Sequence, residues 1–162
     1  MCFSVEVQKE VDALLKPFKA KKSRYQDEYD FLQTKAQDLN FVKEALALKR
    51  KPTSLFFKEP ADDNRIFPGY FAWVLVNENG VNEFKKMRYR VRPQNSKEEI
   101  PSKFNVFNAR IDSLEARQTW KPLFTRQHGL IPFTRFFEWV EHDGKKRLIS
   151  FAPKDREIMW AA

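Results

Sequence analysis

Apolar residues recur at helical spacing over the N-terminal part of the chain and at alternate positions over the rest. The first stripe has four apolar positions three or four residues apart: Val7, Val11, Leu14 and Phe18. This spacing predicts a short first helix, which Pro17 limits. A second stripe with the same spacing runs over residues 25–46 and predicts one long helix or two joined helices.

From residue 70 onward the pattern is that of strands. An apolar run, Tyr70–Val76, a turn at residues 77–80 and a return strand, Phe84–Arg92, predict a hairpin. Asp112 and Glu115 have capping-box spacing and predict a short helix that ends near Trp120. Further strands are expected at residues 104–108, 130–131, 136–141, 148–152 and 157–162, with a hairpin turn at residues 142–144.

These elements predict an α+β fold: a mainly antiparallel, strongly curved, barrel-like sheet with N-terminal helices. The length is that of one domain, residues 1–162. The last predicted strand runs to Ala162 without a turn or a polar tail. We therefore expect that the domain is incomplete at its C-terminal end, and that this chain associates with itself or with a complementing chain there.

Alternation in the return strand predicts a cationic face. Met87, Tyr89 and Val91 would face one way, and the opposite face would carry four cations: Lys86, Arg88, Arg90 and Arg92. The chain has 30 Lys and Arg against 22 Asp and Glu and a net charge of +8, which favours a polyanionic partner, nucleic acid first. A solvated charged surface is the alternative interpretation.

Composition narrows the class of protein further. A hydrophobic content of 42%, with 15% aromatic residues, excludes a disordered chain, and 32% charged residues exclude a membrane protein. The single cysteine cannot form an internal disulfide, and no apolar run near the N-terminus resembles a signal peptide. We expect a soluble protein in a reducing, cytoplasmic location, associated with the nucleoid if the protein is bacterial.

That single cysteine, Cys2, becomes the N-terminal residue if Met1 is removed. An N-terminal cysteine carries an amine, with a pKa of roughly 7.7–8.0, beside a thiol, with a pKa of about 8.5. Together these groups can close a thiazolidine ring on an aldehyde. The alternative is a small buried thiol in a first strand.

Three segments together resemble the SRAP (SOS response-associated peptidase) family. Met1-Cys2 matches the start of the family's Met-Cys-Gly-Arg, and Asn108-Ala109-Arg110 matches Asn-Ala-Arg-x-Glu, with Asp112 in the Glu position. Leu130-Ile131-Pro132 and Arg135–Trp139 match Leu-Val-Pro and Gly-Phe-Tyr-Glu-Trp. The resemblance extends over the whole chain and is loosest over residues 20–65.

The resemblance implies a cofactor-free enzyme, without a metal, that crosslinks Cys2 to abasic sites in single-stranded DNA during the DNA damage response. It implies that Glu138 is the general acid and base, that Asn108 hydrogen-bonds near the reacting sugar or the Cys2 backbone, and that Arg110 holds a phosphate. The four cations of the return strand would follow the DNA backbone. Asp112 would orient Arg110 or cap the predicted helix, and the cap is the interpretation we favour.

The sequence also departs from the family. Phe3-Ser4 replaces Gly-Arg, which removes a cation beside the nucleophile, and Arg135 replaces a glycine. The family's His-x-Arg-Met-Pro segment has no counterpart, and neither His128 nor His142 lies in such a motif. Two alternatives therefore stay open: a cysteine-type peptidase that acts on its own leader, and a non-enzymatic nucleic-acid-binding module.

Overall fold

The structure is a computed structural model of the chain. It describes residues 4–8, 10–23, 35, 38–45, 47–51, 60, 62–92, 96–98, 100–101, 104 and 107–162. The helices are α1 (Asp12–Leu15) and α3 (Leu39–Ala45). The strands are β1 (Ser4–Val7), β2 (Ala20–Lys22), β3 (Arg65–Ile66), β4 (Phe71–Glu78), β5 (Val81–Arg88), β6 (Gly129–His142), β7 (Lys145–Phe151) and β8 (Met159–Ala161).

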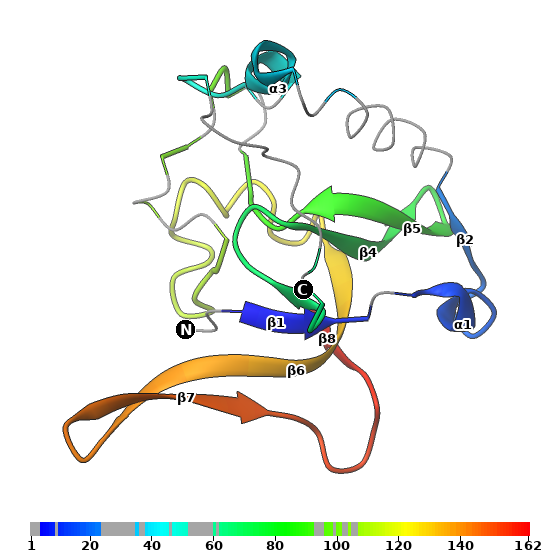
Figure 1. Cartoon of the computed structure of the whole chain (residues 1–162). Coiled ribbons are helices and arrows are strands. Elements are labelled where there is room, and N and C mark those ends of the chain that lie inside the picture. The colour runs from blue at the N-terminus through cyan, green and yellow to red at the C-terminus, as the bar shows by residue number, and fades with distance from the viewer. Residues whose placement is uncertain are drawn as a thin grey trace.

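One eight-stranded sheet organises the described chain. Figure 1 shows β6 as the long strand that links the β4–β5 hairpin to the β7 hairpin. Its hydrogen-bonded path runs β2-β5-β4-β6-β1-β3, and β7 and β8 both pair with β6. Strands β2 and β5 are parallel, and the other pairs are antiparallel. The α+β class is therefore confirmed, but the expected barrel-like curvature is wrong: the sheet is mixed and open, because β2 and β3 end its path without pairing with each other.

Strand β6 is the centre of this sheet. Its first residues pair with β4, the next with β8, the middle with β1 and the last with β7. Where β6 begins, the backbones lie close together: a Cβ built on Gly129 would lie 2.5 Å from Val74 Cγ1. Only a glycine allows this approach without a shift of neighbouring atoms.

Both predicted hairpin turns are confirmed, and the reason is backbone conformation. Asn79 and Gly80, between β4 and β5, have φ values of 52° and 80°. Asp143 and Gly144, between β6 and β7, have φ values of 51° and 68°. Two consecutive positive φ values are typical of the turns that match the twist of a hairpin, and Asn, Asp and Gly adopt them most readily.

The helical predictions fare less well. The first helix is only the four-residue α1, and most of the stripe at residues 25–46 lies outside the described residues. In α3, the Asp38 carboxylate accepts hydrogen bonds from the backbone N–H groups of Asn40 and Phe41, at 3.0 and 3.1 Å. This is N-terminal capping, which satisfies donors that lack a partner in the helix.

Residues 111–126 form successive turns, so the predicted helix from Asp112 to Trp120 is wrong. The described residues of the segment at 104–108 are not in a strand either. In the part of the chain that the structure describes, no helix is long and apolar enough to cross a lipid bilayer.

Candidate nucleophile and nucleic-acid site

The predicted nucleophile, Cys2, lies outside the described residues. The described chain begins at Ser4, the first residue of β1, and Ser4 lies opposite Phe137 of β6. The next pair is Val5 opposite Phe136. The start of β1 therefore lies beside the segment of β6 that carries Glu138.

Glu138 is half-buried in β6 and lies opposite Ile149 of β7. Side chains alternate between the two faces of a strand, so Glu138 shares a face with Phe136 and Val5. Ser4 and Phe137 lie on the opposite face. The register therefore places the predicted general acid and base on one side of the β1–β6 pair and the first described residue on the other.

Asn108 is held by a tyrosine that sequence analysis did not single out. The Tyr89 hydroxyl donates a hydrogen bond to Asn108 Oδ1 at 2.7 Å, and the Tyr89 ring packs edge-on against Phe107. Tyr89 also packs, with Phe136, against the core cluster around Val5. Asn108 is thus attached to the side of the β1–β6 pair that carries Glu138.

Arg110 and Asp112 form an exposed ion pair. Arg110 Nε donates to both carboxylate oxygens of Asp112, at 3.0 and 3.2 Å. The hydrogen bond from Arg110 lowers the pKa of Asp112, and the same bond raises the pKa of Arg110. Our preference for Asp112 as a helix cap is wrong, since no helix follows; Asp112 instead orients the guanidinium.

The predicted row of four cations is broken. Strand β5 ends at Arg88, so Arg90 and Arg92 do not continue its alternation. Lys86 lies over the ring of the buried Trp73, with its ammonium 5.2 Å from the ring centroid. Arg88 Nε donates to the Gly69 carbonyl, and Arg90 Nη2 donates to that of Ile100.

This arrangement has a physical reason. Lys86 and Arg88 share their face of β5 with Phe84, which is fully buried, whereas Met87 on the other face is exposed. The cations therefore lie at the margin of the core, where their stems cover apolar surface. Arg92 is exposed.

A further arginine, Arg65 of β3, lies beside the start of β1. Arg65 Nη2 donates to Ser4 Oγ at 2.8 Å, and the guanidinium lies 4.2 Å from the Phe137 ring centroid. Nothing in the sequence marked this residue, because β3 has only two residues and its neighbours show no alternation.

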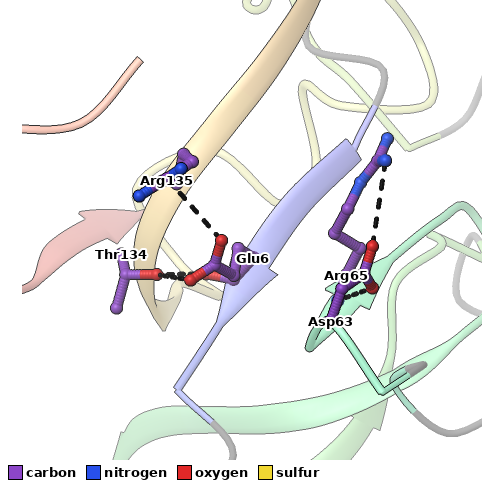
Figure 2. A network of polar contacts seen from close by, with 5 residues as sticks. All are labelled: Glu6, Asp63, Arg65, Thr134 and Arg135. Atoms are coloured by element: carbon purple, nitrogen blue, oxygen red, sulfur yellow. Dashed lines mark hydrogen bonds and ion pairs between the residues drawn. The ribbon is translucent and has the colours of Figure 1, made fainter. Parts of the chain in front are cut away.

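Figure 2 shows the polar contacts around β1. On the β6 side, Thr134 Oγ1 donates to Glu6 Oε1 at 2.7 Å, and Arg135 Nε lies 3.6 Å from Glu6 Oε2. On the β3 side, the Arg65 side chain runs alongside β1 towards the first residue of the strand. Among the described residues, no three His, Cys, Asp or Glu side chains gather as metal ligands do.

Comparison with protein families gives a match over the full length: the sequence model of SRAP, the SOS response associated peptidase family, covers residues 1–162. The chain belongs to the SRAP family. The family is named for the SOS response, which is a response to DNA damage. No curated protein matches the chain.

A solved structure shares the SRAP chain's fold. It is the crystal structure of a protein from Bacteroides thetaiotaomicron, determined as a structural-genomics target, with a TM-score of 0.59 and 14% sequence identity. The match covers 98% of the SRAP chain and 57% of the other chain. The chain described here thus spans little more than half the length of that neighbour.

Proposed function

We propose that this SRAP protein forms a covalent thiazolidine crosslink between Cys2 and abasic sites in single-stranded DNA. The observation that carries the proposal is the pairing of Ser4 with Phe137, next to Glu138. Consecutive Cα atoms are about 3.8 Å apart, so the covalent chain keeps Cys2 within about 8 Å of Ser4. The covalent chain therefore limits how far Cys2 can lie from Ser4 and from the segment of β6 that carries Glu138.

The proposed reaction needs no cofactor. The Cys2 amine condenses with the aldehyde of the ring-opened sugar and releases one water, which gives an imine. The thiol then adds to the imine carbon, and its proton passes to the imine nitrogen, so that a five-membered ring closes. An aminothiol can trap an aldehyde in this way because amine and thiol are on adjacent carbons.

Glu138 would move protons between the sugar oxygens, the amine and water during these steps. Asn108 would hydrogen-bond near the reacting sugar, on the side of the sheet that Tyr89 fixes for it. Because Glu138 and Ser4 lie on opposite faces, the proposal requires the N-terminal residues to pass the end of the β1–β6 pair towards the Glu138 side.

Cationic side chains of the protein would contact the phosphates of the DNA strand. Arg110, oriented by Asp112 and exposed, has donors that remain available for a phosphate oxygen. Lys86, Arg88, Arg90 and Arg92 would add contacts that do not depend on base sequence. A cytoplasmic location, where a free thiol stays reduced, belongs to the same proposal.

The decisive experiment is incubation with an oligonucleotide that carries one abasic site, followed by heat denaturation and electrophoresis. The intact protein should give a heat-stable covalent band, and intact mass should show that Met1 is absent. Cys2→Ala should abolish the band and leave noncovalent binding nearly unchanged, because phosphate contacts supply that affinity. Cleavage of a peptide without a DNA adduct would favour the peptidase alternative, and binding alone would favour the binding module.

The role of Glu138 has a matched control on its own strand. Glu138→Gln keeps the shape and removes the titrating proton, so crosslinking should slow by roughly ten- to ten-thousand-fold with binding retained. Glu141→Gln changes an exposed carboxylate three residues further along β6 and should leave the rate unchanged. Equal rates for the two variants would assign Glu138 to structure.

A further inference from the structure

The guanidinium of Arg65 is held rigidly beside the first described residue. It donates to Ser4 Oγ at 2.8 Å and lies 4.2 and 5.2 Å from the ring centroids of Phe137 and Phe67. Ser4 itself is fully buried, and 19% of the Arg65 side chain is exposed. Two aromatic contacts and one hydrogen bond therefore fix where this cation lies and which way it points.

The charge of Arg65 is poorly compensated by the described residues. The Asp63 carboxylate lies 3.9 Å from Nη1, beyond hydrogen-bonding distance, and is itself largely exposed. Glu6 shares this face of β1 but is engaged by Thr134 and Arg135. Arg65 Nε is buried and has no hydrogen-bond partner among the described residues. A partly buried cation in this state is costly, and an anion bound to it would reduce the cost.

We propose that Arg65 binds a phosphodiester of the DNA strand next to the abasic nucleotide and so positions the sugar for Cys2. This inference rests on the proposed function and names the residue that would orient its substrate. A guanidinium suits the task because its planar donors match two oxygens of one phosphate. Arg65 lies on the Ser4 face of the β1–β6 pair, so a phosphate on Arg65 would lie near the end of β1 that leads to Cys2, and the sugar would extend past that end towards Glu138 on the other face.

The position of Arg65 also accounts for one departure of the sequence from the family's opening motif. Ser4 stands where the family's opening motif has an arginine, and the serine hydroxyl accepts a hydrogen bond from Arg65. The neighbouring strand β3 thus supplies a guanidinium beside the position at which the family motif has an arginine.

The test separates phosphate binding from crosslinking. Affinity is measured with an oligonucleotide that carries a tetrahydrofuran analogue, which has no aldehyde, and a neutral methylphosphonate replaces each nearby phosphate in turn. For the intact protein, one replacement beside the analogue should weaken binding by about ten- to hundred-fold, the range expected for hydrogen bonds to a charged group. Because only the DNA changes, this result does not depend on whether a variant folds.

Arg65→Gln should bind the unmodified oligonucleotide more weakly and lose its sensitivity to that one replacement, with a salt slope lower by about 0.7. Arg65→Lys should keep part of the sensitivity. Arg126→Gln removes an exposed arginine before β6 and should keep all of it. The proposal is overturned if Arg65→Gln is folded and as sensitive as the intact protein, or if no methylphosphonate near the analogue matters. It is equally overturned if inorganic phosphate alone raises the melting temperature through Arg65 while every methylphosphonate is tolerated. Absence of crosslinking to a true abasic site would instead refute the proposed function.

Discussion

Two hairpins of this protein have the same turn chemistry and opposite surroundings. In the β4–β5 hairpin, the residues Phe71–Leu75 are all buried, and the fully buried Phe84 faces them from β5. In the β6–β7 hairpin, every residue of β7 is exposed, and Trp139 of β6 is 52% exposed. Figure 1 shows this second hairpin extending away from the rest of the sheet.

The difference in burial between the two hairpins comes from the elements that pack beside each of them, and not from the pattern of apolar residues in the sequence. Strand β4 lies between β5 and β6, and the core around Trp73 includes Val11 and Leu14 from the segment of α1. Among the strands that the structure describes, β7 pairs with β6 alone. Alternation and turn residues therefore predict that a hairpin forms, but they do not predict what covers it.

We expect the largest effect on stability when a phenylalanine is replaced by alanine in each hairpin and the two losses are compared. Phe84→Ala should lower the free energy of unfolding by about 3–5 kcal/mol, because it leaves a cavity in the core. Phe151→Ala should cost far less, since Phe151 is 42% exposed and stacks on the half-buried Phe136. Urea unfolding of both variants measures the difference. Equal losses would mean that β7 is covered as well as β5 is.

A smaller effect is expected where β6 meets β4. Gly129→Ala introduces a Cβ 2.5 Å from Val74 Cγ1 and should cost about 1–3 kcal/mol by overpacking. Val74→Ala in the same chain removes the clashing methyl group, so the double variant should be more stable than the sum of the single changes predicts. Additive losses would show that the close approach does not limit this junction.

On the exposed hairpin, a charge should be tolerated. Leu148→Lys, opposite Trp139, should change the free energy of unfolding by less than about 0.5 kcal/mol. It should also reduce association at high concentration, because exposed apolar surface on an edge strand favours contacts between chains. Light scattering measures this, with Lys146→Ala on the same face of β7 as the control. A stability loss above about 2 kcal/mol would contradict the exposure of this face.

The smallest effect concerns pH and the β2 edge of the buried hairpin. Lys21 Nζ lies 2.9 Å from Glu83 Oε1, and this hydrogen bond, followed by the charges of Lys21 and Lys85, lowers the pKa of Glu83. Stabilisation is therefore complete above the ordinary glutamate pKa of about 4.3 and is lost as pH falls through the lowered pKa of the folded state. Glu83→Gln should flatten this acid dependence of the unfolding midpoint, whereas Glu141→Gln on the other hairpin should not.

Local chemistry explains how much of the fold could be predicted. The two hairpin turns followed from Asn79-Gly80 and Asp143-Gly144, because few other residues adopt their φ values. The openness of the sheet and the end of β5 at Arg88 could not be predicted, since they depend on which strands lie beside each other. The predicted helix at Asp112 is absent: residues 111–126 form turns, and the Asp112 carboxylate binds Arg110.

The residues of the candidate site also divide into those that the sequence predicted and those that it did not. Asn108 and Glu138 were predicted from motif segments, and the structure attaches both to one side of the β1–β6 pair, while their catalytic roles remain proposals. Cys2 stays a prediction outside the described residues. Tyr89 and Arg65 were missed because each acts across the fold, on Asn108 and Ser4, and no spacing along the chain records such a contact.

The pairing of β1 with β6 has a consequence for biosynthesis. Thr134 and Glu6 are hydrogen-bonded across 128 positions of the chain, so the first strand leaves the ribosome long before its partner exists. Contacts of such separation form slowly. On the nascent chain, β1 can therefore pair with β3 early, but the side of β1 that faces β6 stays unpaired until residues 133–137 have been translated. An interrupted translation product that ends before β6 would lack the strand that carries Glu138, and under the proposed function it should not crosslink DNA.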